Sequence, residues 1–360
     1  MKFTYLCGAL LALAFATSLA HAEPYLAIQQ GLKCAQCHVN PTGGGERTAF
    51  GNVFAQTQLP ANRIDTGPDV WTGDLMKFLS IGGDLRFQGT YTRMPQGQST
   101  DQFDLEQARV YLSANVIPNR LIVYVDEQVA PGGALNREAY AMFWSARHDW
   151  YVKAGQMYLP FGWRLQDQTA LVLEATGLNM TTPDKGAEFG WERGNWDAQV
   201  AVSNGSAGGP ETDHRKQYSG QLSYVRSFWR LGAAANYNDA DAGSKSSYGI
   251  FAGLRTGPIA WLGEAALIDD HSITTGGKQL AMLGEGNWRI TQGHNLKITA
   301  EYRDPNRDVG HDTQTRYSLV YELTPIQFLQ LRGGFRYSDG IPQAPQQHLK
   351  LLFIELHGFF

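Results

Sequence analysis

The chain has 360 residues and a formal net charge of −4, and it contains 40 glycines, nine tryptophans and sixteen tyrosines. So small a charge gives no indication of a nucleic-acid partner. No apolar run after residue 22 approaches the roughly 18 residues of a transmembrane helix, which excludes a helical membrane protein. The composition is typical of an outer-membrane β-barrel, because half of the strand residues in such a barrel face a polar lumen.

The first 22 residues have the pattern of a secretory signal peptide. Lys2 is followed by an apolar run over residues 6–19 and by Ala-His-Ala at 20–22. We therefore expect the mature chain to start at Glu23 and to work outside the cytoplasm. Cys7 lies in the segment that would be removed, so only two cysteines would remain.

The two remaining cysteines belong to a CxxCH motif at residues 34–38, the attachment pattern of a c-type haem. Cys34 and Cys37 would form thioether bonds to a single covalent haem c, and His38 would be the proximal iron ligand. Two alternatives stay open at this point. One is a structural or redox disulfide, which as a thioredoxin-like pair would require a surrounding βαβ pattern. The other is half of a zinc site, which would require a fourth nearby ligand.

The motif lies in a small segment, residues 23–70, for which we predict a short α-helical c-type monohaem cytochrome unit. Apolar residues precede the motif at helical spacing, and Phe50, Val53 and Phe54 repeat that spacing after it. About 48 residues are marginal for a core of their own. We therefore expect this segment to dock against, or into, the part of the chain that follows.

The distal iron ligand is less well indicated by the sequence. No histidine occurs between His38 and His148. Met76 is the nearest thioether, and His357 shares the strand face of Glu355, so both are candidate distal ligands. A packing role for Met76, a solvated role for His357 and a five-coordinate iron are the alternatives.

From residue 71 to residue 360 the sequence alternates apolar and polar residues in runs separated by turn signals. Sixteen runs can be counted, and an even number is what a closed bacterial barrel requires. We predict an all-β fold, a 16-stranded antiparallel transmembrane β-barrel preceded by the small helical haem segment. The expected strands are 79–93, 103–116, 120–129, 135–145, 150–159, 186–193, 196–204, 217–227, 230–238, 246–256, 259–269, 277–289, 294–304, 313–323, 326–338 and 347–360.

The connections between these strands alternate between tight and long, as periplasmic turns and extracellular loops do. Tryptophans cluster near the tight set, as expected of an aromatic girdle at one membrane interface; a soluble β-sandwich with buried tryptophans is the alternative. The tight turns are expected at Pro118-Asn119, Arg147-His148, Gly194-Asn195, Ser227-Phe228, Gly257-Pro258, Gln292-Gly293 and Thr324-Pro325, and the tryptophans are Trp144, Trp150, Trp191, Trp196, Trp229, Trp261 and Trp288.

One long connection has no strand pattern up to Gly186, and loops of this length are usually functional. In a 16-stranded barrel such a segment could fold inward and narrow the pore. The Gly-Gln-x-x-x-Pro-Phe-Gly run at residues 155–162, with the strand after it, resembles the phosphate-selective porin O/P family.

The N-terminal unit joined to such a barrel resembles a second group, the fused monohaem cytochrome–porins of iron-oxidising bacteria. This resemblance implies electron uptake from an extracellular donor such as Fe(II), with transfer through the haem to periplasmic c-type cytochromes or other carriers. The matching residues are Cys34, Cys37, His38, Pro41, Phe50, Gly51 and Phe54.

The resulting hypothesis is an electron-transfer protein of the bacterial outer membrane, in contact with lipid, whose haem segment lies on the periplasmic side or inside the barrel. It would be a redox carrier, with iron oxidation as one option, rather than a conventional enzyme. A passive diffusion porin for anions or small solutes, with a haem-bearing plug, is the first alternative. A haem sensor or scaffold for periplasmic cytochromes is the second.

Overall fold

The computed structural model describes residues 23–65, 67, 70–272, 277–341 and 347–360. The expected signal peptide, with Cys7, lies outside the described residues. The helices are α2 (Pro24–Gln30), α3 (Cys34–Cys37), α4 (Ala49–Thr57), the 3-10 turn η2 (Pro95–Gly97) and α5 (Leu171–Thr176). The strands are β1 (Asp74–Met76), β2 (Leu79–Arg93), β3 (Ser99–Ile117), β4 (Leu121–Ala130), β5 (Leu135–Trp144), β6 (Trp150–Met157), β7 (Asp184–Arg193), β8 (Trp196–Ser203), β9 (Gln217–Val225), β10 (Trp229–Asn238), β11 (Lys245–Thr256), β12 (Ile259–Asp270), β13 (Gly277–Thr291), β14 (His294–Asp304), β15 (Gln314–Ile326), β16 (Leu329–Asp339) and β17 (Leu349–Phe359).

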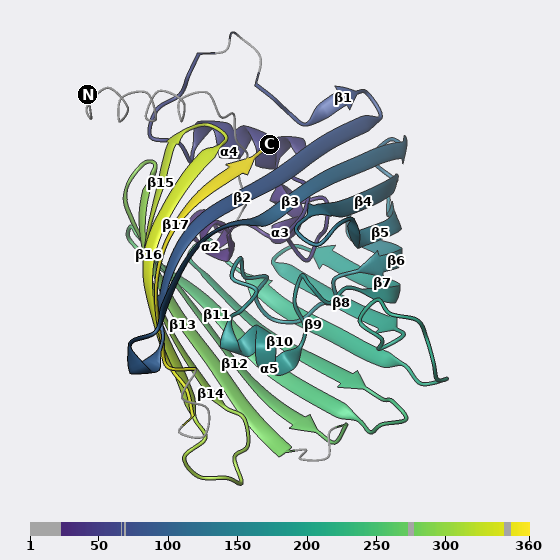
Figure 1. Cartoon of the computed structure of the whole chain (residues 1–360). Coiled ribbons are helices and arrows are strands. Elements are labelled where there is room, and N and C mark those ends of the chain that lie inside the picture. Colours follow the sequence, from purple (N-terminus) through teal and green to yellow (C-terminus); the bar gives the residue numbers. More distant parts are fainter. Residues whose placement is uncertain (1–22, 66, 68–69, 273–276, 342–346) are drawn as a thin grey trace, which may run out of the picture.

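Strands β2 to β17 form a closed antiparallel barrel (Figure 1). Each strand pairs with the next in sequence, and β17 pairs with β2 to close the cylinder, for example Leu352 opposite Tyr91. Closure satisfies the backbone groups that an open sheet edge would expose to lipid. The described residues thus confirm the predicted sixteen-stranded barrel, with β1 as a short addition that pairs with the start of β2.

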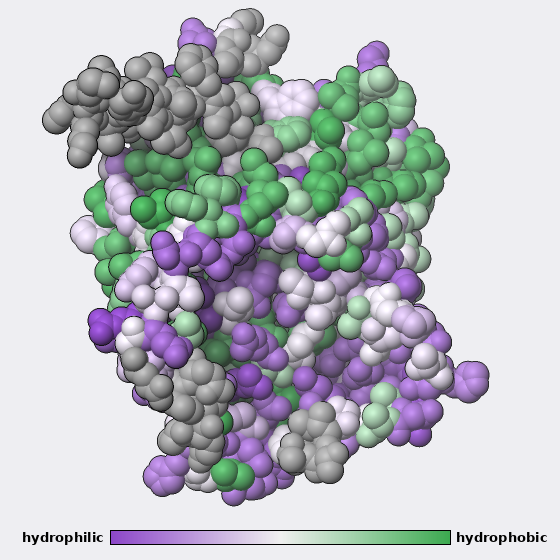
Figure 2. All heavy atoms as spheres, viewed as in Figure 1, coloured by the Kyte–Doolittle hydropathy of each residue, from purple (hydrophilic) through white to green (hydrophobic). Residues whose placement is uncertain are grey.

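The two faces of each strand differ in burial, as expected for a wall between lipid and lumen. In β10, Arg230 and Ala234 are buried inside the barrel, whereas Leu231 and Tyr237 are exposed outside. Exposed aromatic and aliphatic side chains recur at alternate positions around the outside. Figure 2 shows apolar side chains gathered towards the end that carries the short turns and polar ones towards the long loops. This apolar exterior fits a membrane-spanning barrel.

Most tryptophans near the short turns do lie on the outer surface. Five of them, Trp150, Trp191, Trp196, Trp261 and Trp288, are 36% to 47% exposed, as expected for an interfacial girdle. Trp144 is an exception, because it is buried on the lumen face. It lies two residues after Met142 in β5, so both side chains point to the same side of the strand, and it packs against Tyr151.

One predicted turn is wrong. Thr324-Pro325 does not connect two strands, because β15 continues to Ile326 and the turn is made by residues 327–328. The pairing with β16 shifts register between Leu323 and Ile326. Such a bulge accommodates a proline, which cannot donate to a strand ladder.

The N-terminal helices α2, α3 and α4 lie inside the barrel near the short-turn end (Figure 1, purple). We call residues 23–65 the plug. The connection between β6 and β7, residues 158–183 with α5, also folds into the lumen, as predicted, and we call it the inward loop. Its apolar residues pack with those of α2 and of the barrel wall in one buried cluster. No helix among the described residues is long and apolar enough to cross a membrane.

Candidate functional site

The plug is tied to the barrel wall by buried polar contacts. Glu23 pairs with Lys297 of β14, Lys33 pairs with Glu192 of β7 at 3.0 Å, and the side-chain amide of Asn40 donates to Glu138 of β5. Because each pair buries a charge of the wall against a partner from the plug, the barrel interior is complementary to the N-terminal segment.

The CxxC part of the motif forms the single turn α3. Gln36 Oε1 accepts the backbone N–H of Lys33 and thereby caps this turn. The two thiols are free and half-buried. Burial raises the pKa of both thiols, that of Cys37 to about 11, whereas the Arg230 guanidinium, 3.7 Å from the Cys34 sulfur, acts in the opposite direction. Both thiols are therefore protonated at neutral pH.

His38 ends α3 and is held by a short stretch of extended chain. It forms an antiparallel bridge with Arg47, and the backbone N–H of Thr48 donates to the carbonyl of Cys37 at 3.0 Å. The imidazole is only 6% exposed, and its buried Nδ1 has no hydrogen-bond partner among the described residues. Burial, together with the nearby Arg47 charge, lowers the pKa of His38 to about 4. The ring is neutral at pH 7, the form that binds metals.

Helix α4 packs directly on the motif. Thr48 caps its first turn by accepting the N–H of Gly51 at 3.1 Å. A Cβ at Gly51 would lie 2.2 Å from the carbonyl oxygen of Cys37, so only glycine permits this approach. The Phe50-Gly51…Phe54 pattern noted in the sequence therefore has a packing reason.

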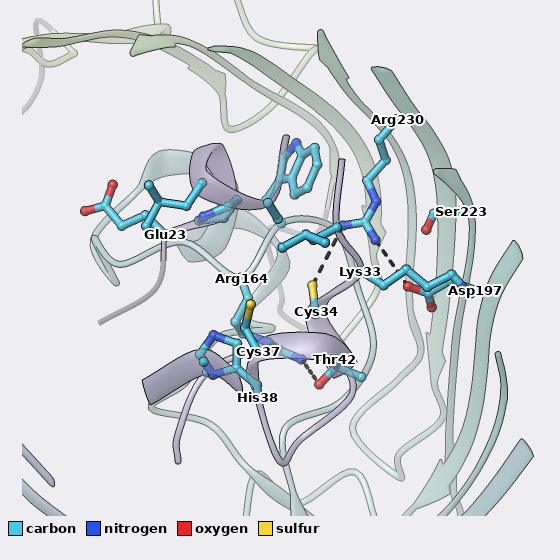
Figure 3. A pocket seen from close by; sticks show the side chains of 18 of the residues that line it. Glu23, Lys33, Cys34, Cys37, His38, Thr42, Arg164, Asp197, Ser223 and Arg230 are labelled. Carbon is cyan, nitrogen blue, oxygen red and sulfur yellow. Dashed lines mark hydrogen bonds and ion pairs between the residues drawn. The ribbon is translucent and has the colours of Figure 1, made fainter. Parts of the chain in front are cut away.

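Cys34, Cys37 and His38 line one cavity in the lumen, shown in Figure 3. It contains about 860 Å³ of empty space, a value that includes space open to solvent. Apolar residues from three sources form much of its wall, namely Leu26, Leu32 and Phe54 of the plug, Trp163 of the inward loop and Phe251 of the barrel. The cationic side chains on the wall are Lys33, Arg47, Arg164 and Arg230.

The inward loop supplies one side of this cavity in a fixed position. The indole N–H of Trp163 donates to the carbonyl of Gly263 at 3.0 Å, and its ring meets Phe251 edge to face at 5.1 Å between centroids. The next residue, Arg164, donates to Thr42 of the plug at 3.2 Å. The barrel thus completes a site that the N-terminal segment begins.

The structure does not bring the two candidate distal ligands to this cavity. Met76 lies on β1 at the barrel rim and is 57% exposed. His357 faces the lumen, as predicted from its place on the same strand face as Glu355, but its ring contacts Gln330 and Asp84. Neither residue is among those that line the cavity, and both remain sequence-based predictions.

Sequence reasoning missed the residues that the barrel contributes. Trp163 and Arg164 follow the Pro-Phe-Gly run, and Arg230 lies on a lumen-facing position one residue into β10. Strand parity could have placed Arg230 in the lumen. No sequence signal indicates that these residues meet the haem motif, since they are more than 100 positions away.

A second cavity, of about 1120 Å³, continues through the lumen on the other side of the first turn of α2. Glu23 and Pro24 line both cavities. Charged side chains of both signs line the second one, among them Lys297, Arg332 and Asp167. Across the described ranges, no group of three or more His, Cys, Asp or Glu side chains is placed to hold a metal ion.

Comparison with known proteins supports the fold. No family model matches the sequence, and no curated protein matches it either. A loop-deletion mutant of OmpT, an outer membrane protein of Vibrio cholerae, is similar in structure (TM-score 0.60, 12% identity, 78% of this chain and 99% of that chain). So are an anion-selective porin from Comamonas acidovorans (TM-score 0.59, 11%, 78% and 99%) and the outer membrane channel DcaP of Acinetobacter baumannii (TM-score 0.57, 10%, 83% and 100%). The chain therefore has the fold of porin-like outer-membrane β-barrels.

Proposed function

We propose that this chain is an outer-membrane barrel whose plug carries one covalent haem c, and that it exchanges electrons between an extracellular donor or acceptor, such as Fe(II), and periplasmic carriers, including c-type cytochromes. The observation that carries the proposal is the convergence of Cys34, Cys37 and His38 on one largely enclosed cavity inside a closed barrel. The apolar exterior supports a place in the outer membrane, with the short-turn end in the periplasm.

The residues present fit a c-type haem. Two free thiols lie one turn apart, a buried neutral imidazole follows at once, and aromatic and aliphatic side chains line the same cavity. The raised thiol pKa values argue against a redox dithiol, because reactive pairs of that kind have a lowered pKa. When bound, the haem would supply one-electron chemistry whose potential depends on axial ligation and burial.

The chain's own residues would position the group and keep water away from it. α3 fixes the two sulfur atoms, the bridge to Arg47 fixes His38, and Trp163 closes the side that faces the barrel wall. A plug anchored by buried ion pairs also separates the two ends of the lumen better than an open pore would. These features suit electron exchange at each end.

Attachment can be tested on the full chain, produced in a host that matures c-type cytochromes. We expect one haem per chain by covalent haem staining and absorption spectroscopy, no haem in Cys34→Ala/Cys37→Ala, and an altered spectrum in His38→Ala. His148→Gln, at the barrel rim, is the matched control and should keep the wild-type spectrum. A folded but colourless wild-type barrel would remove the proposal.

Transfer itself requires proteoliposomes with a membrane-impermeant donor outside and a soluble cytochrome enclosed. Reduction of the enclosed cytochrome should depend on Cys34 and Cys37. Full haem loading without any such reduction would instead favour the sensor or scaffold alternative.

Passive diffusion of anions or small solutes past a haem-bearing plug is the second candidate. The charged second cavity favours it, as does the similarity in fold to porins. A large, steady conductance of the haem-loaded protein in planar bilayers, unchanged in Cys34→Ala/Cys37→Ala, would support diffusion over electron transfer.

A further inference from the structure

Two of the cationic side chains on the cavity wall have no carboxylate of the described residues within ion-pair distance. Arg230 has a carboxylate partner, Asp197, at 3.3 Å. Arg47 and Arg164 line the same cavity, and neither forms an ion pair with any described residue. Burial lowers the pKa of both guanidinium groups, that of Arg47 to about 10, yet arginine stays charged at neutral pH.

The contacts that these two arginines do make leave donors free. Arg164 uses Nη2 for both of its hydrogen bonds, to Thr42 Oγ1 at 3.2 Å and to the carbonyl of Leu159 at 3.0 Å. The Arg47 guanidinium lies 5.0 Å from the ring centroid of Phe359, a contact with the aromatic face that needs no N–H donor. Because a guanidinium carries five N–H donors, each group can still bind an anion.

Carboxylates act on these groups only from beyond ion-pair distance, Glu138 and Glu188 on Arg164 and Asp84 on Arg47. A buried cation with no carboxylate in contact is costly, and a cation–π contact offsets only a small part of that cost. Two such cations on one cavity wall therefore indicate an anionic ligand. Arginine is also the side chain best suited to planar carboxylates, which it binds with paired N–H donors. The bridge between Arg47 and His38 fixes one of the two cations beside the expected iron ligand.

We propose that Arg47 and Arg164 form a carboxylate pocket for the propionate groups of the haem. This inference rests on the proposed haem attachment. Since Arg47 belongs to the plug and Arg164 to the inward loop, the bound carboxylates would link the plug to the barrel. The barrel would then take part in setting the redox potential of the haem.

The main test is the midpoint potential of the haem in full-length variants. Removing a cation beside the propionates favours the oxidised haem, so Arg164→Gln and Arg47→Gln should each lower the equilibrium constant for reduction about tenfold. That change corresponds to about 59 mV for a one-electron couple. Arg164→Lys and Arg47→Lys, which keep the charge, should recover most of the potential.

Arg255→Gln is the matched control. Arg255 also joins barrel to plug, by donating to the carbonyl of Gln29 at 2.7 Å, but it does not line the cavity. Its potential should stay at the wild-type value. If a glutamine variant does not fold, as judged by the mobility of the unheated barrel on gels, the lysine variant and resonance Raman spectra of the propionate groups give the same comparison.

The outcomes separate this inference from the function on which it rests. A wild-type chain without haem overturns the proposed function. Haem-loaded Arg47→Gln and Arg164→Gln variants with the potential of Arg255→Gln overturn the carboxylate pocket alone. A site for a free anion would give a different result. Inorganic phosphate would stabilise the haem-free variant Cys34→Ala/Cys37→Ala but not the same variant with Arg164→Gln added, and the potential of the haem-loaded protein would not change in Arg164→Gln. That result would also overturn the carboxylate pocket.

Discussion

Glu46 shows how the plug can be sensitive to pH through a single residue. It is 1% exposed, its Oε1 accepts from Ser113 of β3 at 3.0 Å, and its Oε2 has no partner among the described residues. Burial raises the pKa of Glu46 to about 7. The folded protein therefore keeps a proton on this carboxyl over a pH range in which the unfolded chain has lost it.

The sign of the resulting pH dependence follows from linkage. The contribution of protonated Glu46 to the free energy of unfolding is fully present below pH 4.5 and is lost as the pH rises towards 7. The free energy of unfolding should therefore fall by about 1–3 kcal/mol over that interval. Glu46→Gln should flatten this part of the profile in urea titrations. Asp101→Asn, at an exposed carboxyl of β3, should leave the profile unchanged, and a profile as steep in Glu46→Gln as in Asp101→Asn would contradict this prediction.

At the scale of elements, the inward loop joins the plug to the wall. Asp167 of this loop accepts from Arg316 of β15 at 3.2 Å and pairs with Arg336 of β16. These two guanidinium groups hold the pKa of Asp167 well below its usual range. The loop is thus fixed across the lumen by one carboxylate between two cations.

Asp167→Asn should loosen the loop and leave Arg336 without a counter-charge, whereas Arg316 keeps Glu301 at 2.7 Å. We expect conductance in planar bilayers to rise about two- to fivefold, with a shift towards anions, because a fixed positive charge concentrates them. Asp241→Asn removes a comparable contact, 2.9 Å from Arg215, in an exposed loop, and should change neither quantity. A conductance that does not rise in Asp167→Asn would mean that the loop does not restrict the lumen.

At the scale of the whole molecule, local patterns predicted the strands well, because lipid and lumen impose a strict two-residue period on every strand. They also predicted that the short N-terminal segment would not stand alone. They could not show how Arg164 and Trp163 complete the cavity, since such contacts depend on the closed shape of the barrel. The prediction of a turn at Thr324-Pro325 was wrong for a local reason. A proline ordinarily marks a turn, but here β15 contains a bulge and continues beyond the proline.

The plug should behave as part of the barrel fold, and Asn40 allows a test. Its amide donates to both oxygens of the fully buried Glu138, at 2.8 and 3.0 Å, and its oxygen accepts from the fully buried Lys153 at 3.3 Å. Asn40→Ala leaves these wall charges short of a partner, which costs about 1–3 kcal/mol. Because only the docked plug makes these contacts, the substitution should shift the equilibrium between the docked and the undocked plug towards the undocked state.

Trypsin would report the change, because Arg63 is exposed at the C-terminal end of the plug whereas Arg47 is buried within it. In the wild-type protein we expect cleavage after Arg63 and protection after Arg47. In Asn40→Ala, cleavage after Arg47 should become at least tenfold faster while the barrel strands stay intact, as measured by mass spectrometry. Asn136→Ala, which removes a contact to Glu127 within the wall at 3.1 Å, should keep Arg47 protected. Equal protection in both variants would mean that the plug is held by apolar packing and the remaining ion pairs rather than by this buried network.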